Sequence, residues 1–121
     1  MEKKHLFGKK RIVAALTKNV DSEFYELNNP NIKIYEFTDP DKFDKYIMSD
    51  FIHEIAEKCN ADWLDDGEEQ TLFPDTLPIA IEIVSKAIKQ NKNADFKDYL
   101  EQTKELMEIA LANNTFMEFL F

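Results

Sequence analysis

Histidine and cysteine are the residue types in this chain that suit metal binding or nucleophilic catalysis. His53 and Glu57 are four residues apart, so a helix would place both side chains on one face, as a metal pair requires. No third ligand of a suitable type follows nearby, and we interpret the pair as an exposed histidine beside a solvated carboxylate. Cys59 lies between Glu57 and Asp62. Their charges are expected to raise the pKa of its thiol, and a neutral thiol is a poor nucleophile.

Residues 62–73 match a calcium-binding loop only in part. Asp62 and Gly67 fit the first and sixth loop positions. Leu64 falls at the third position and Phe73 at the twelfth, where a bidentate glutamate is required, so this site is excluded. The serines do not lie in glycine-flanked elbows, and two isolated glycines cannot cradle a phosphate. The sequence therefore predicts no enzyme, no cofactor and no metal site.

Acidic residues are the most prominent chemical feature that remains. The chain carries 24 Asp and Glu against 15 Lys and Arg, a formal net charge of −9, which is the wrong sign for a nucleic-acid binder. Residues 62–69 hold five acidic side chains around Trp63. Negative charge steers a basic partner, and a central aromatic residue supplies affinity. The alternative interpretation is a solvated acidic loop whose Trp63 is packed in the core.

The composition fits one folded domain spanning residues 1–121. The chain is 44% hydrophobic and 12% aromatic, enough for an ordered core. Its single cysteine excludes an internal disulfide. No apolar run approaches the roughly 20 residues of a membrane helix, and the N-terminal residues lack an apolar signal core. We therefore expect a soluble cytoplasmic protein.

Alternating β-branched and aromatic residues predict the strands. Residues 32–37 alternate between two faces, and residues 23–27 form a weaker candidate strand. An Asn/Pro turn at residues 28–31 would join them as a hairpin. The apolar run at residues 12–16 fits either a buried strand or a short helix. Residues 115–121 include three phenylalanines, and a strand this apolar is expected to lie inside the sheet rather than at its edge.

A capping signal and an apolar stripe predict a helix in the middle of the chain. The sequence Thr38-Asp39-Pro40 supplies a cap and a proline suited to the first helical turn. An apolar stripe then continues to about Cys59, as one helix or as two if Ser49 recaps the chain. We expect residues 60–76 to form an ordered loop.

Two further helices are predicted in the second half of the chain. Asp75-Thr76-Leu77-Pro78 again offers a cap and a proline, and Ile79 and Ile83 widen the apolar stripe, so this helix should be the most buried. Residues 91–93 end it, and Asp95 can cap the last helix. The elements together predict an α+β fold, in which a small, mainly antiparallel sheet packs against three or four helices.

These features resemble the immunity proteins of bacterial polymorphic-toxin and contact-dependent growth inhibition systems. The resemblance rests on size, acidity and three segments: the loop Asp62-Trp63-Leu64-Asp65-Asp66, the helix start Thr76-Leu77-Pro78-Ile79-Ala80, and the final helix, Asn113-Asn114 and strand. It implies a cytoplasmic protein that binds one cognate toxin domain stoichiometrically, often a nuclease, and neutralises it in the producing cell. We expect a monomer or weak homodimer that contacts neither nucleic acid nor membrane directly.

The expected partner-binding residues are acidic, with one aromatic anchor. They are Asp62, Trp63, Asp65, Asp66, Glu68 and Glu69, helped by Asp39, Asp41 and Asp44. A specific interface buries roughly 800 Å² on each partner. Because one loop is too small for this, a neighbouring helix face is expected to join it.

Three other functions remain open. An acidic nucleic-acid mimic, or a regulatory adaptor that inhibits a DNA-binding protein, would carry a long regular array of carboxylates. A small enzyme would need a deep pocket with perturbed carboxylates, and a homo-oligomer subunit would show a large apolar patch. Residues 1–20 carry six basic side chains and one acidic side chain. These bases could lie far from the acidic surface or neutralise part of it.

Overall fold

The computed structural model describes residues 9–61 and 68–121, which fold around a four-stranded antiparallel sheet. The strands are β1 (Lys10–Ala15), β2 (Ile32–Phe37), β3 (Glu69–Leu72) and β4 (Met117–Leu120), in the spatial order β2-β1-β4-β3. The helices are α1 (Pro40–Ile47), α2 (Asp50–Lys58), α3 (Leu77–Ile88), the 3-10 helix η1 (Asn91–Phe96) and α4 (Lys97–Ala112). The α+β prediction is confirmed, and the C-terminal strand lies inside the sheet between β1 and β3.

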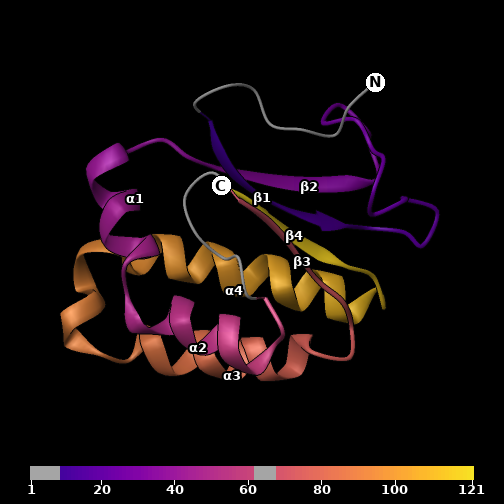
Figure 1. Ribbon diagram of the computed structural model, residues 1–121. Coiled ribbons are helices and arrows are strands. Elements are labelled where there is room, and N and C mark those ends of the chain that lie inside the picture. The colour runs from indigo at the N-terminus through magenta and orange to yellow at the C-terminus, as the bar shows by residue number, and fades with distance from the viewer. Residues whose placement is uncertain (1–8, 62–67) are drawn as a thin grey trace.

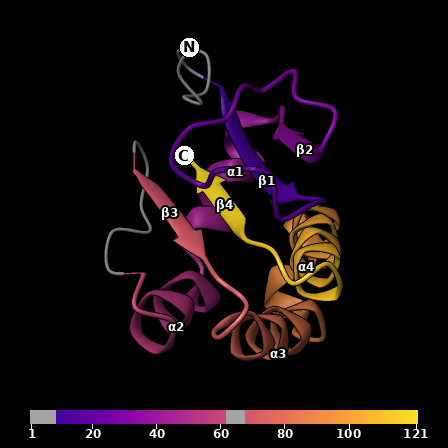
Figure 2. The same cartoon turned by 90° about the vertical axis from the view of Figure 1, so that its right-hand side faces the viewer.

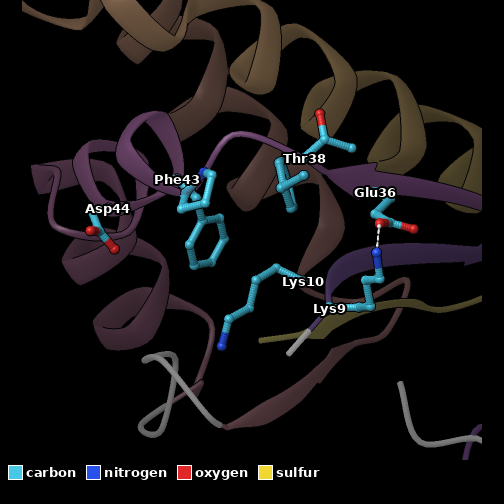
Figure 3. Close-up of a pocket in the computed structure, with 8 residues that line it drawn as sticks. Lys9, Lys10, Glu36, Thr38, Phe43 and Asp44 are labelled. Atoms are coloured by element: carbon cyan, nitrogen blue, oxygen red, sulfur yellow. Dashed lines mark ion pairs between the residues drawn. The ribbon is translucent and has the colours of Figure 1, made fainter. Parts of the chain in front are cut away.

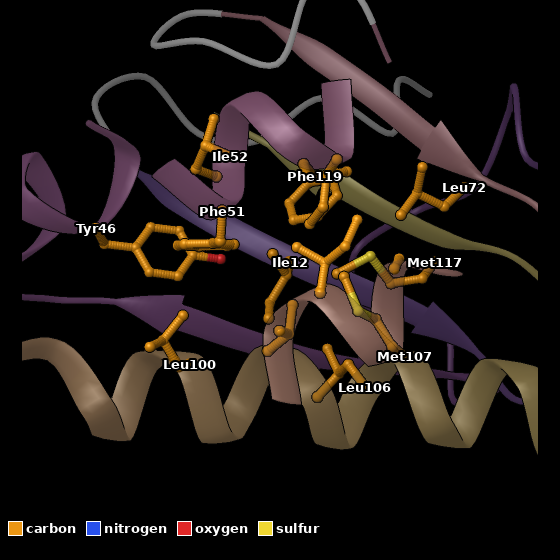
Figure 4. Close-up of a cluster of buried hydrophobic side chains, with 14 of the residues drawn as sticks. Ile12, Tyr46, Phe51, Ile52, Leu72, Leu100, Leu106, Met107, Met117 and Phe119 are labelled. Carbon is orange, nitrogen blue, oxygen red and sulfur yellow. The ribbon is translucent and has the colours of Figure 1, made fainter. Parts of the chain in front are cut away.

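The helices and the β1–β2 connection lie on opposite faces of the sheet (Figures 1 and 2). The helix-covered face holds the larger core. Its aromatic centre is formed by Phe37 and Tyr46, whose ring centroids are 4.9 Å apart. Figure 4 shows Ile12 and Phe119 of the sheet meeting Leu100 and other side chains of the helices. All three are fully buried.

Residues 16–31 cover the other face of the sheet without forming a helix or strand. A smaller buried cluster lies beneath them and includes Val13, Tyr25, Phe116 and Leu120. The ring of Tyr25 lies 5.9 Å from the ring of Phe116. Side chains of β1 and β4 therefore alternate between two separate apolar clusters, as the two-residue period of a strand requires.

The predicted hairpin between residues 23–27 and 32–37 is wrong in one of its strands. The second strand is β2, as predicted, but its partner is β1, with Lys10 opposite Phe37 and Ala15 opposite Ile32. The run at residues 12–16, which fitted strand or helix, thus lies mostly in β1. Residues 23–27 are not a strand because Tyr25 turns inward onto the sheet instead of pairing along its edge.

The long loop predicted for residues 60–76 is also wrong in part, because it contains β3. The sequence of this strand, Glu-Gln-Thr-Leu, carries little β-propensity. It forms through pairing with β4, with Glu69 opposite Leu120 and Leu72 opposite Met117. The neighbouring strand thus determines structure that the local sequence does not indicate.

The predicted helices exist, and of the two alternatives left open after Pro40 the structure has two helices, with the break between α1 and α2 at Met48 and Ser49. Two expected details of α3 differ. The Thr76 side chain does not cap α3, because its hydroxyl donates to the backbone oxygen of Phe73. Ile79 does not widen the buried stripe, since 42% of its surface is exposed.

Asp95 does not cap the last helix. The chain first forms η1, and α4 begins at Lys97 after Phe96, without a side-chain cap. Asp95 instead forms an ion pair with Lys45 of α1 at 3.0 Å. The carboxylate thus joins two elements that are distant in sequence.

Candidate partner-binding surface

The predicted acidic residues that the structure describes lie at one end of the sheet, which we call the α1 end. Here β1 and β3 begin and β2 and β4 end. The backbone oxygen of Glu68 accepts a hydrogen bond from the Phe121 amide at 3.1 Å. The Lys10 ammonium donates to the Phe121 backbone oxygen at 2.7 Å. These bonds bring Glu68 next to the start of β1, and α1 follows β2 at the same end (Figure 1).

Three predicted aspartates belong to helix α1 and its N-cap, and their structural roles differ. The Asp39 carboxylate accepts from the amides of Asp41 and Lys42, both at 3.1 Å, so it caps the helix. Asp41 lies in the first turn and is exposed, which favours the helix through its positive N-terminal dipole. Asp44 is exposed one turn later. Asp41 and Asp44 are therefore the aspartates of this helix available to a partner.

A hollow of about 210 Å³ opens between α1 and the start of β1. Figure 3 shows Phe43 and Asp44 on its helical side and Lys10 on its strand side. Lys9 and Glu36, which also line the hollow, form an ion pair at 3.4 Å on its strand side, and the Lys10 ammonium lies 5.9 Å from the Phe43 ring. Two bases of the N-terminal segment thus lie beside the acidic α1 end.

The sequence did not predict the position of Lys9 and Lys10. It left open whether the N-terminal bases lie far from the acidic residues or next to them. The antiparallel register between β1 and β2 decides the matter for these two, because it places Lys10 opposite Phe37, three residues before Pro40 of α1. No local pattern could show this, since the pairing joins residues distant in sequence.

Carboxylates on a second surface, which we call the helix flank, are neutralised by lysines. On this flank α1 and α2 meet η1 and α4. The ion pairs Lys42–Asp98 and Lys45–Asp95 are 3.0 Å long, and Lys92–Asp50 is 2.6 Å long. The hydrogen bond from Lys92 lowers the pKa of Asp50, and the bond to Asp98 raises the pKa of Lys42. These carboxylates already have partners within the chain.

The exposed carboxylates at the α1 end differ in this respect. Within residues 9–61 and 68–121, no ion pair involves Asp41, Asp44 or Glu68. An exposed carboxylate without an internal partner gives up no ion pair when it meets a lysine or arginine of another protein. The α1 end is therefore the described surface on which the predicted acidic residues best suit a basic partner.

The remaining predicted residues are divided. Asp62, Trp63, Asp65 and Asp66 lie outside the described residues. Glu69 is half-buried and lies opposite Leu120, so it faces the smaller cluster beneath residues 16–31 rather than open solvent. Of the predicted residues, the structure therefore places Asp41, Asp44 and Glu68 at the same end of the sheet, with Asp39 as the cap of α1.

A buried carboxylate on β4 was not anticipated. Glu118 is 1% exposed, and the Tyr25 hydroxyl donates to its Oε1 at 2.8 Å. Burial, followed by the charge of Glu118, raises the pKa of Tyr25 far above its ordinary value. Alternation along β4 could have indicated that Glu118 faces away from the helices. Its burial depends on residues 16–31, whose path has no periodic signal.

The side chains considered for metal binding and nucleophilic catalysis do not come together in one site among the described residues. His53 and Glu57 are exposed on α2, and no group of three metal-ligating side chains occurs in the described part of the chain. Burial, and then the charge of Asp75, raises the pKa of the Cys59 thiol. The rise was expected, and among the described residues Asp75, rather than Glu57, supplies the charge that accompanies burial. No helix among the described residues is both long and apolar enough to cross a membrane.

Comparisons with known proteins gave no match that bears on this surface. No protein-family model, no curated protein and no solved structure matches this chain.

Proposed function

We propose that this chain is an immunity-type inhibitor that binds a basic toxin domain, a nuclease, and neutralises it stoichiometrically in the cytoplasm of the producing cell. The observation that carries the proposal is the division of carboxylates. Those of the helix flank are held in ion pairs with lysines, whereas Asp41, Asp44 and Glu68 of the α1 end have no ion pair among the described residues.

The chemistry of a nuclease explains why such a surface would inhibit it. A nuclease cleft is lined with lysine and arginine, which hold the phosphates of the substrate. Carboxylates presented on a folded surface occupy the same positive field without being cleaved. Charge of opposite sign also raises the association rate, which matters because a toxin must be captured before it acts.

The two lysines beside this surface are compatible with the proposal. Lys9 pairs with Glu36, and Lys10 donates to the Phe121 backbone oxygen. Both ammonium groups are thus tied to atoms of their own chain. A basic partner would meet Asp41 and Asp44 of α1 and Glu68 before β3, with these tethered lysines lining the same hollow as Asp44.

The first test is capture of the partner. The tagged chain is recovered from its native cell, and the bound protein is identified by mass. One stoichiometric partner with a basic domain, toxic when expressed alone and harmless when co-expressed with this chain, supports the proposal. A scatter of unrelated DNA-binding proteins would instead support a nucleic-acid mimic, and no partner at all would contradict the proposal.

The second test compares two double variants with the same net charge. Asp41→Asn with Asp44→Asn removes charge from the α1 end, and Glu101→Gln with Glu108→Gln removes it from exposed positions of α4. We expect the first pair to slow association with the captured partner roughly tenfold at low salt and to flatten its salt dependence. The second pair should change both quantities by less than about twofold. Equal slowing in both pairs would show that net charge alone is responsible.

A further inference from the structure

A second hollow, of about 200 Å³, lies at the end of the sheet opposite the α1 end. It is bordered by the residues after β3, by the start of β4 and by the segment that follows β1. Its apolar wall is formed by Val20, Phe73, Pro74 and Phe116, and Lys18 also lines it. Phe73 remains 49% exposed. An aromatic side chain left half in water beside a hollow is a feature of docking surfaces.

The size of this hollow indicates what it can hold. Pockets that bury a drug-sized molecule measure roughly 300–1,000 Å³. A hollow of about 200 Å³ is smaller than these and suits one side chain of another protein. Because its wall is mainly apolar, an aliphatic or aromatic side chain fits it best.

Strand β3 connects the hollow to the acidic α1 end. It is an edge strand of the sheet, and its four residues span about 13 Å. Figure 2 shows β3 along one side of the molecule, away from α4. Glu68 lies just before the strand, and Phe73 lies just after it. One partner could therefore contact both ends of β3 at the same time.

The charge along this edge is acidic. Between Cys59 and Lys86 the sequence contains no lysine or arginine. Glu68 and Asp75, which bracket β3 and the exposed Phe73, are themselves exposed. Lys18 is the basic residue at the hollow. The edge is thus complementary to a basic protein that also presents an apolar side chain.

We infer that the basic partner of the proposed function lies along β3 and inserts one apolar side chain against Phe73 in this hollow. The inference rests on the proposed function and names the second anchor of the same interface. A specific interface buries roughly 800 Å² on each partner. The β3 edge and its hollow enlarge the acidic surface of the α1 end, which already includes the face of α1 that carries Asp41 and Asp44.

Photo-cross-linking in the native cell tests the placement. The cross-linking residue p-benzoylphenylalanine replaces Phe73 in one variant and Glu108, exposed on α4, in the control. The aromatic replacement keeps the character of Phe73, so the variant is expected to fold. We expect the captured basic protein to cross-link from position 73 and not from position 108.

Dissociation of the captured complex gives a second, independent measurement. Phe73→Ser should raise the dissociation rate constant at least tenfold and leave the association rate within about twofold. Glu108→Ser should change neither. Phe73→Ser is thus expected to change dissociation and not association, whereas Asp41→Asn with Asp44→Asn is expected to slow association.

The outcomes separate this inference from the proposed function. A toxic partner that is captured and neutralised, yet neither cross-links at position 73 nor dissociates faster from Phe73→Ser, overturns the inference and leaves the proposed function standing. A basic partner that cross-links at position 73 but is not toxic supports the inference and overturns the proposed function. Failure to capture any protein overturns both.

Discussion

The two faces of the sheet are covered by different kinds of structure. Helices α1 to α4 cover one face, and its interior is apolar and rich in aromatic rings around Phe37 and Tyr46. Residues 16–31, which form neither helix nor strand, cover the other face, and a carboxylate lies buried beneath them. Each strand contributes side chains to both. Each face therefore combines apolar packing with a buried tyrosine hydrogen bond, and among the described residues only the face beneath residues 16–31 buries a carboxylate.

The two coverings should differ in how far they relax when a buried side chain is shortened. A helix holds its side chains at fixed positions, so the cavity left by a truncation beneath it stays largely open. An irregular segment can shift toward a hole and close part of it. The helix-covered face should therefore tolerate truncation less than the face beneath residues 16–31.

The largest expected effect comes from a matched pair of leucine truncations. Leu106 of α4 and Leu120 of β4 are both fully buried, on the helix-covered face and the other face respectively. We expect Leu106→Ala to lower the free energy of unfolding by about 4 kcal/mol and Leu120→Ala by about 2–3 kcal/mol. Urea unfolding measures both. An equal or larger loss at Leu120 would show that residues 16–31 are packed as rigidly as the helices.

The second expected effect is a loss of stability at high pH that involves both faces. Burial raises the pKa of Tyr25 and of Tyr46 above the ordinary value near 10. The unfolded chain loses these protons above about pH 10 while the folded chain keeps them, so stability is full below pH 10 and falls as the pH rises. Each tyrosine contributes a slope of up to about 1.4 kcal/mol per pH unit. Urea midpoints between pH 9 and pH 11 measure this fall.

Single phenylalanine variants separate the two contributions. Tyr25→Phe and Tyr46→Phe should each remove part of the alkaline slope, because each deletes one titrating group. The pKa values of Cys59 and Tyr35 are also raised, so a weaker slope is expected to remain in the double variant. A slope of unchanged size would assign the alkaline loss to groups other than Tyr25 and Tyr46.

The smallest expected effect compares the two hydroxyl groups at neutral pH. Thr103 donates to the Tyr99 backbone oxygen, so the hydroxyl of Tyr46 is the donor in its 2.7 Å bond to Thr103. Tyr25 donates instead to the Glu118 carboxylate. Bonds to charged groups contribute more, so Tyr25→Phe should cost about 1.5–3 kcal/mol and Tyr46→Phe about 1 kcal/mol.

One control variant tests whether the charge of the acceptor explains this difference. Glu118→Gln should reduce the cost of Tyr25→Phe, since a neutral acceptor gains less from the hydroxyl. If Tyr46→Phe is the more damaging of the two at pH 7, the polar contact on the face beneath residues 16–31 is not the stronger one.

The sequence predicted the fold more fully than it predicted the candidate surface. Helical stripes and the alternation at residues 32–37 indicated most elements, because apolar periodicity reports directly which side chains a helix or strand buries. Strand β3 was not predicted, because it is short and half-buried and forms by pairing with β4. The path of residues 16–31 was not predicted either, because single side chains such as Tyr25 anchor it and no periodic pattern marks it.

For the candidate surface, the sequence showed that the residues are acidic but did not show where they lie in the fold. The excess of acidic residues was evident, but Asp50, Asp95 and Asp98 look like Asp41 and Asp44 in sequence. The three-dimensional structure separates them, since lysines from other elements pair with the first three. Ion pairs such as Lys92–Asp50 join residues 42 positions apart, and no local pattern encodes such a distance.

Composition and periods of a few residues predict the α+β class, the central C-terminal strand and the negative charge. Only the packing of the chain shows which of the described carboxylates lack an ion pair, that Lys9 and Lys10 line one hollow with Asp44, and that Glu118 is buried. The physical reason is the same in each case. Antiparallel pairing and helix packing bring together residues distant along the chain, and electrostatic interactions depend on distance in space rather than on separation in sequence.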